Sequence, residues 1–300
     1  MSEPATTRTA AARLPLRGYL LHLTHYDPVW VARKSQEQPF ELDLALQIVD
    51  TLAARGFNTL LVGVSDGVVF ASHPELRRPY SQPIAQLAQL CAHARQKGLE
   101  IIPKLNFSKS EVNCHDHWSR APGEPWHTHF DDDVYFQRGF DVIDEIIAAC
   151  KPARYFHVGM DEDHERSHAQ YVRAILRLRE GLAARHLRTV CWSDSAIDYS
   201  SGDVYREKTA FAETQLPTDC VRLLWNYWNV PAGVMQTIRH AGYELWGAPG
   251  GKLEQATAFR DALLAAGGTG LVMTHWIACR HENQAALLAR ITDLAGVYQT

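Results

Sequence analysis

Short apolar runs alternate with amphipathic stretches along most of this chain. Eight runs have the length and the β-branched or leucine-rich content of strands that are covered on both faces. They span residues 18–24, 58–64, 100–106, 154–160, 189–192, 221–226, 243–247 and 270–274. Each run is followed by a stretch with the apolar spacing of a helix, over residues 42–54, 84–97, 140–149, 168–185, 204–211, 232–240, 253–266 and 282–294.

Eight strands that alternate with eight helices predict a single (β/α)8 barrel rather than an open doubly wound sheet. The length of 300 residues suits this fold, which usually takes about 250 residues. We expect a flexible leader over residues 1–16 and the barrel over residues 17–300. The first predicted strand is not followed by a Gly-x-Gly-x-x-Gly motif, which weakens a dinucleotide-binding alternative.

Composition and charge limit which kinds of molecule the protein is expected to bind. The formal net charge of −4 gives no basic footprint for nucleic acid or for an anionic membrane surface, and no apolar run is long enough to cross a bilayer. The six cysteines include no Cys-x-x-Cys pair, so we expect reduced thiols and a cytoplasmic protein. No cofactor is implied, and no feature predicts an oligomeric state.

The carboxyl ends of the predicted strands carry polar and aromatic residues, and in a barrel this end holds the active site. Five of the eight tryptophans fall there. A single tryptophan at such a position most often serves the core, whereas several beside carboxylates and amides suit a sugar. The candidate substrate-binding residues are His25, Asp66, Asn106, His157, Trp192, Asp194, Trp225, Asn226, Tyr227, Trp246 and Trp276.

Residues 155–163 form the strongest local feature. Strand alternation would place His157, Gly159 and Asp161 on one face, and Glu162 just past the strand end could bend over the same pocket. Two adjacent carboxylates raise the pKa of one of them, as a general acid at neutral pH requires. The alternative is structural, since acidic residues also favour the first turn of a following helix.

The longest non-helical connection covers residues 107–137 and contains His115, His117, Trp118 and Trp126. Loops of this length in compact domains are usually functional. We expect this loop to cover the barrel mouth and to help choose the substrate; a solvent-facing loop or a subunit contact is the alternative.

The segment from His157 to Glu162 resembles the His-x-Gly-Gly-Asp-Glu signature of the family 20 glycoside hydrolases, the β-N-acetylhexosaminidases. The likeness extends to Arg17-Gly18, Gly56-Phe57-Asn58, Ser65-Asp66, Ile101-Ile102-Pro103 and Trp192-Ser193-Asp194. It covers roughly residues 17–276, which is the catalytic barrel alone. Met160 replaces the second glycine, His25 stands where an arginine grips the sugar, and Lys104-Leu105-Asn106 replaces an acidic segment.

This resemblance implies a glycoside hydrolase that removes terminal 2-acetamido sugars. Glu162 would protonate the leaving oxygen, and Asp161 would orient the substrate's own acetamide, whose carbonyl oxygen attacks the anomeric carbon. Trp192, Trp225 and Trp276 would wall the acetamide and the sugar, with Tyr227 as a donor to the acetamide oxygen.

Three alternatives remain open from the sequence. His22, His25, His115, His117, His157 and Asp161 could serve a metal-dependent hydrolase, although their spacing is not diagnostic. The altered sugar-gripping positions could belong to a non-catalytic carbohydrate-binding barrel. A two-carboxylate glycosidase would need a nucleophile such as Asp66 or Glu244 facing Glu162, and Glu244 is expected near the barrel floor.

Overall fold

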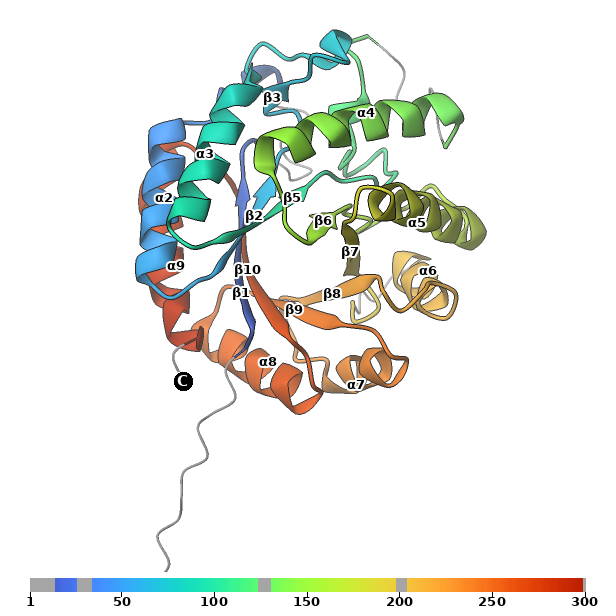
Figure 1. Cartoon of the computed structure of the whole chain (residues 1–300). Helices are drawn as coiled ribbons and strands as arrows, with labels where there is room; N and C mark the ends of the chain where they lie inside the picture. Colours follow the sequence, from blue (N-terminus) through green and yellow to red (C-terminus); the bar gives the residue numbers. More distant parts are fainter. Residues whose placement is uncertain (1–13, 26–33, 124–130, 198–203, 299–300) are drawn as a thin grey trace, which may run out of the picture.

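The computed structural model describes residues 14–25, 34–123, 131–197 and 204–298. In this part of the chain eight parallel strands close into a barrel (Figure 1), so the predicted (β/α)8 fold is confirmed. The last strand pairs with the first to complete the ring. The barrel strands are β1 (Leu16–His22), β2 (Thr59–Gly63), β5 (Glu100–Lys104), β6 (Tyr155–His157), β7 (Arg188–Ser193), β8 (Val221–Asn226), β9 (Leu245–Pro249) and β10 (Gly270–Ala278).

Helices surround the barrel on all sides in Figure 1. They are α2 (Leu42–Ala54), α3 (Ile84–Gln96), α4 (Asp133–Cys150), α5 (His168–Ala183), α6 (Val204–Glu213), α7 (Ala232–His240), α8 (Leu253–Ala265) and α9 (Gln284–Ala295). A small parallel pair, β3 (Val68–Val69) and β4 (Gln82–Pro83), lies within the connection from β2 to α3.

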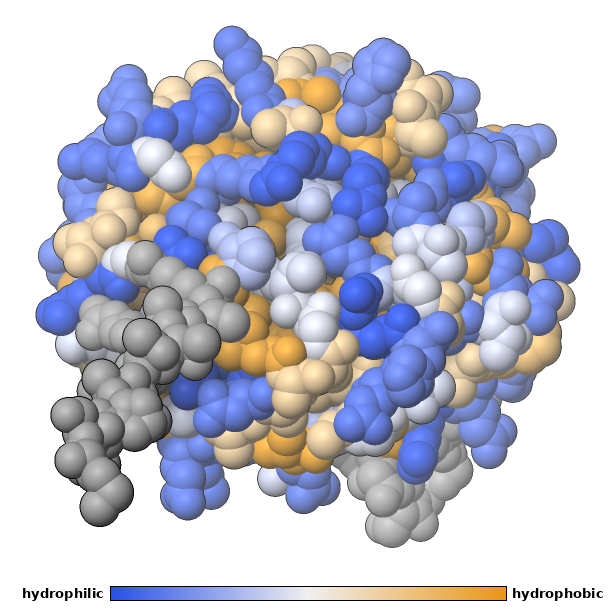
Figure 2. All heavy atoms as spheres, turned by 60° about the horizontal axis from the view of Figure 1, so that its bottom comes forward, coloured by the Kyte–Doolittle hydropathy of each residue, from blue (hydrophilic) through white to orange (hydrophobic). Residues whose placement is uncertain are grey.

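The core has two layers because each strand is apolar on both faces. Side chains such as Leu61, Ile102 and Val272 fill the inside of the barrel. A larger cluster lies between the sheet and the helices, where the buried stripe of α4 includes Val142 and Ile146. The opposite faces of the helices carry hydrophilic side chains, and in Figure 2 such side chains cover most of the surface in view, with hydrophobic ones interspersed.

Two of the predicted boundaries that differ in the structure lie next to the site. β6 ends at His157 rather than at residue 160 because Gly159 and Met160 take positive φ angles, which no strand accommodates. α4 begins at Asp133 rather than at residue 140. The side chain of Asp132 caps it by accepting a hydrogen bond from the Tyr135 amide at 2.8 Å, so the loop before it is shorter than expected.

Three further expectations concern the whole chain. All six cysteines are buried free thiols. Among the described residues, no helix has the length and apolar content that a membrane crossing needs. Most of the expected leader lies outside the described residues, while Leu14 is buried and β1 already begins at Leu16.

Candidate active site

The two candidate catalytic carboxylates lie on a tight turn just after β6. Gly159, Met160 and Glu162 have φ angles of 73°, 74° and 49°. A left-handed conformation costs a residue with a side chain about 1–3 kcal/mol, so Met160 and Glu162 are both strained. A Cβ atom on Gly159 would approach Asn106 Oδ1 to 1.9 Å, and this position therefore requires glycine.

Side chains from three other elements hold this turn. Asn106 accepts a hydrogen bond from the Met160 amide at 3.0 Å and donates to Asp161 Oδ1 at 2.6 Å. Asp194 accepts from the Glu162 amide at 2.8 Å. Tyr171 of α5 donates to the Met160 carbonyl at 2.7 Å. The direction in which both carboxylates point is therefore set by the barrel and not by the turn alone.

Two residues of the loop after β5 contact the carboxylates. Asn113 donates to Glu162 Oε2 at 2.9 Å. The imidazole of His115 lies between the pair, with Nδ1 3.6 Å from Asp161 Oδ1 and Nε2 3.6 Å from Glu162 Oε2. The Asp161 side chain is 8% exposed and that of Glu162 is 25% exposed. Glu162 is thus the more accessible of the two.

The pKa values of the two carboxylates shift in opposite directions. Burial acts to raise the pKa of Asp161, but His115, Lys104 and the Asn106 amide outweigh burial and hold this pKa well below its usual range. Burial acts to lower the pKa of His115, yet the two carboxylates raise it above the ordinary value. The shift in the pKa of Asp161 thus favours the ionised carboxylate, and the shift in the pKa of His115 favours the charged imidazole.

The pKa of Glu162 shifts the other way. Burial raises the pKa of Glu162, against the effect of His115 and together with the charge on Asp161. Two neighbouring carboxylates whose pKa values are pushed apart form the arrangement that an acid catalyst and a charge stabiliser use. Burial and the Asp161 charge also raise the pKa of Asp194, whose oxygens accept from the Glu162 amide and the Trp225 indole.

Aromatic residues of β8 and β10 lie beside this pair. Trp276 Nε1 donates to the Tyr227 hydroxyl at 2.8 Å, and Thr274 donates to the same oxygen at 3.3 Å. The two acceptor sites of this oxygen are therefore used, and its own proton is left to donate to another group. Burial raises the pKa of Tyr227, and the nearby charges of Asp161 and Glu162 act in the same direction.

A layer of basic side chains lies inside the barrel beneath Asp161. Lys104 is fully buried, 6.0 Å from the centre of the Trp192 ring, and burial lowers its pKa to about 8. Burial and Lys104 also lower the pKa values of His22 and His157, which favours their neutral forms. His157 packs against Trp192 with ring centres 4.8 Å apart. His157, Trp192 and Lys104 therefore lie together inside the barrel.

His25 and Asp66 belong to a separate buried cluster at the ends of β1 and β2. Both Glu37 oxygens contact His25, through its amide at 2.9 Å and its Nδ1 at 2.9 Å. Lys34 lies 3.4 Å from Glu37 and 3.3 Å from Asp66. Asp66 also accepts from Thr24 and Tyr80 at 2.8 and 2.6 Å. The described contacts thus join these two predicted residues to each other through Lys34.

Two predicted site residues have other positions. Trp246 was expected at the end of a strand over 243–247, but β9 begins at Leu245, so Trp246 lies near its amino end. There its indole donates to Glu244 at 3.0 Å, at the barrel floor, and its placement at the active end is wrong. Asn226 directs its amide to backbone groups, donating to the Ala196 carbonyl and accepting from the amides of two following residues.

The loop residue Trp118 is also not at the surface. It is 1% exposed, packs between Phe107 and Tyr135, and donates its indole hydrogen to the Asn106 carbonyl. Trp118 therefore holds the loop down from inside. Trp126, which carried the same expectation, lies outside the described residues.

Sequence reasoning missed Asn113 and Glu37, and it considered His115 as a possible metal ligand and as one of the loop side chains expected to help choose the substrate. The length of the loop was the one signal that pointed toward Asn113 and His115. Nothing local to Glu37 signals a buried carboxylate, because its partner His25 is brought to it by the fold. In the described ranges, no three His, Cys, Asp or Glu side chains are arranged to hold a metal ion.

Comparison with known proteins supports the barrel resemblance. The barrel superposes on a family 20 β-N-acetylhexosaminidase from Streptomyces coelicolor A3(2) with a TM-score of 0.68 and 17% identity, covering 95% of this chain and 64% of that one. The fold resemblance to family 20 is confirmed. With a coverage of 64%, this chain spans less than two thirds of the length of that enzyme.

Two further solved structures give the same result. A family 20 exo β-N-acetylglucosaminidase from Vibrio harveyi matches with a TM-score of 0.60 and 14% identity, over 95% of this chain and 54% of that one. Dispersin B matches with a TM-score of 0.60 and 14% identity, over 94% of this chain and 98% of that one. No family model and no curated protein sequence matches the chain.

Proposed function

We propose that this protein is a glycoside hydrolase that removes terminal 2-acetamido sugars by substrate-assisted, retaining catalysis. The observation that carries the proposal is the pair of carboxylates on the turn after β6. The pKa of Asp161 is lowered and that of Glu162 is raised, and His115 lies 3.6 Å from each. The fold shared with family 20 enzymes supports the same conclusion.

In this mechanism Glu162 is the general acid. Its carboxyl group donates a proton to the glycosidic oxygen as the bond to the anomeric carbon breaks, which contributes about 10²–10⁴ in rate. The hydrogen bond from Asn113 orients the carboxyl group, and the partial exposure of Glu162 gives it access to the substrate. After the leaving group departs, the ionised Glu162 accepts a proton from the attacking water.

Asp161 stabilises the positive charge that develops on the substrate's acetamide. The carbonyl oxygen of that acetamide attacks the anomeric carbon and forms an oxazolinium ring, so the protein supplies no nucleophile. A fixed negative charge beside the ring lowers the activation barrier for forming the oxazolinium, because the charge is already in place before the reaction starts. The hydroxyl of Tyr227 would donate to the carbonyl oxygen, and Trp276 would pack against the acetamide.

A two-carboxylate mechanism has weaker support. Glu244 is bound to Arg188 at 2.5 Å and lies at the barrel floor, far from the carboxyl ends of the strands. Asp66 is 2% exposed, and Thr24 and Tyr80 occupy its oxygens. A non-catalytic carbohydrate-binding barrel would have no need to shift the pKa values of Asp161 and Glu162 in opposite directions.

A thiazoline analogue of the oxazolinium intermediate tests the proposal. Isothermal titration calorimetry with the wild type should give binding at least tenfold tighter than that of the matching free 2-acetamido sugar. The Asp161→Asn variant keeps the shape of the side chain and loses its charge, so most of this difference should disappear. A wild type that binds the analogue no better than the free sugar would contradict substrate assistance.

A further inference from the structure

The residue after the acid, Asp163, is the centre of a buried network of charges. Its side chain is 0% exposed. It accepts four hydrogen bonds: from the Lys109 amide at 2.8 Å, Lys208 Nζ at 3.0 Å, the Arg166 amide at 3.1 Å and Arg166 Nη1 at 2.5 Å. Each of its oxygens therefore binds two donors, and no lone pair is left for a substrate.

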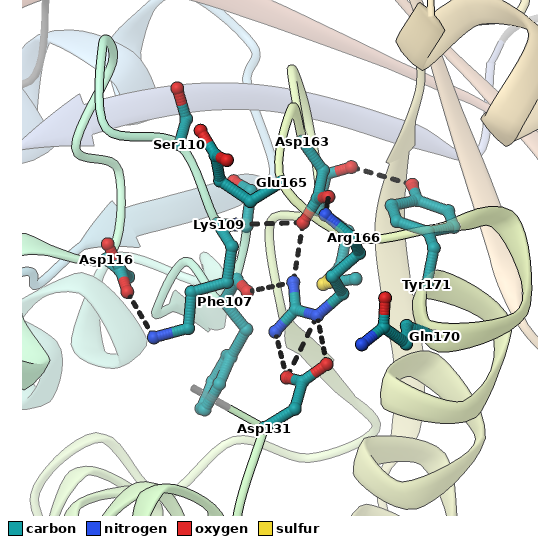
Figure 3. A network of polar contacts seen from close by, with 12 residues as sticks. Phe107, Lys109, Ser110, Asp116, Asp131, Asp163, Glu165, Arg166, Gln170 and Tyr171 are labelled. Carbon is teal, nitrogen blue, oxygen red and sulfur yellow. Dashed lines mark hydrogen bonds and ion pairs between the residues drawn. The ribbon is translucent and has the colours of Figure 1, made fainter. Parts of the chain in front are cut away.

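The network extends outward from Asp163 on both sides, as Figure 3 shows. The Arg166 guanidinium lies between Asp163 and Asp131, with Nη2 2.8 Å from Asp131, and it donates to the Phe107 carbonyl at 2.9 Å. Lys109 points away from Asp163 and binds Asp116 at 2.8 Å. Lys208 reaches in from α6 and also donates to the Asp163 carbonyl.

This network joins two segments that both contact the candidate acid. The Lys109 amide donates to Asp163, and the Lys109 carbonyl accepts from the amides of His164 and Glu165 at 3.0 and 3.1 Å. The loop after β5 is thus fastened to the turn after β6 by backbone bonds as well as by charges. This is the loop that brings Asn113 and His115 to Glu162.

Stability alone gives a poor reason for so many buried charges. The desolvation of buried ion pairs offsets most of their attraction, and apolar residues of the same volume often serve stability equally well. A strained turn persists only where its surroundings fix it completely. The turn at Met160 and Glu162 is such a case, and charges with directional bonds fix a conformation more narrowly than apolar packing does.

We propose that Asp163 is a positioning residue for Glu162. Its carboxylate holds the left-handed turn that carries the acid, and it locks that turn to the loop that supplies Asn113 and His115. Asp163 does not touch the substrate; it acts through the placement of Glu162. The catalytic part of this inference rests on the proposed function, whereas the structural part does not.

The test compares two aryl 2-acetamido glycosides, one with a poor and one with a highly activated leaving group. The Asp163→Asn variant of the full chain should lose about 10- to 100-fold in kcat/KM on the first substrate, because a misplaced acid protonates poorly. It should lose less than threefold on the second, which needs little protonation. A general loss of folded protein would lower both rates by the same factor.

Glu244→Gln is the matched control, since it makes the same carboxylate-to-amide change in an ion pair at the barrel floor. It should change the rates on the two substrates by equal factors. If Asp163→Asn does not fold, Lys208→Met, which removes one cationic partner of Asp163, takes its place with the same expected split. Equal losses on both substrates in the folded variant would overturn the positioning role.

Hydrogen exchange separates this inference from the proposed function. Peptides that cover residues 105–116 and 157–166 should exchange at least tenfold faster in Asp163→Asn than in the wild type, and those of Glu244→Gln should not change. A wild type inactive on both glycosides would refute the proposed function, and exchange would still decide whether Asp163 holds the turn. Unchanged exchange in both peptides would overturn the inference.

Discussion

The pKa values of two neighbouring carboxyl groups shift in opposite directions. Asp161 and Glu162 adjoin in sequence and share His115, yet burial and charge lower the pKa of the first and raise that of the second. The difference arises from contacts. Asp161 accepts a hydrogen bond from the Asn106 side chain and is also stabilised by the charge of Lys104. Glu162 accepts a hydrogen bond from Asn113 at one oxygen and is more exposed.

Removal of the acid gives the sharpest prediction at this scale. Glu162→Gln should lower kcat/KM by about 10²–10⁴ for a glycoside with a poor leaving group and by much less for an activated aryl glycoside. Steady-state kinetics on both substrates measures this split. Asn113→Asp, which replaces the donor to Glu162 with a charge, should lower the first rate and leave the protein folded. Equal losses in Glu162→Gln would reject its role as the acid.

The pH profile gives the same variant a second readout. Glu162 must carry a proton to act, so activity falls as pH rises through its raised pKa. Asp161 and His115 both face Glu162. His115 also loses its proton as pH rises, so its titration contributes to the same decline in activity. Glu162→Gln has no proton to lose, and its residual activity on the activated glycoside should lack that part of the decline.

At the scale of the element, the loop after β5 differs most from its sequence-based interpretation. Its length predicted a role at the barrel mouth, and Asn113 and His115 do reach the carboxylates. Its two tryptophans were expected to help choose the substrate, but Trp118, the one that the structure describes, is buried between Phe107 and Tyr135. The aromatic residue holds the loop, and polar residues contact the site.

Trp118→Ala should therefore act on stability. Loss of a buried tryptophan costs about 3–5 kcal/mol, which urea denaturation would detect as a lower midpoint with an unchanged slope. In the fraction that stays folded, the ratio of kcat/KM on an extended glycan to that on a small aryl glycoside should match the wild type. A specific rise in KM for the glycan, without loss of stability, would restore the sugar-binding role.

At the scale of the whole molecule, the barrel was predictable because its strands are apolar on both faces and its helices are amphipathic. The same pattern predicted that Asp161, Glu162, Asn106 and Tyr227 end on one rim. Strand ends were less certain, and an error of two residues at β9 carried Trp246 to the opposite end of the barrel. The pattern of apolar residues therefore predicts where a strand lies more accurately than it predicts the residue at which the strand ends.

Contacts between distant segments were not predictable. Asn113 meets Glu162, His25 meets Glu37, and Lys208 meets Asp163 only after the barrel has closed. Polar residues in loops have no periodicity that reveals their partners. The candidate carboxylates could thus be located from the strand ends, whereas the residues that contact and orient them required the fold.

The most direct test of the central claim compares the wild type on two aryl β-glycosides that differ only at C2, one with an acetamido group and one with a hydroxyl. Only the first can supply its own nucleophile. We predict a kcat/KM at least 10³-fold higher for the 2-acetamido glycoside, since well-placed intramolecular attack lowers the barrier by several kcal/mol. Comparable rates on both substrates, or hydrolysis of the 2-hydroxy glycoside alone, would contradict the account.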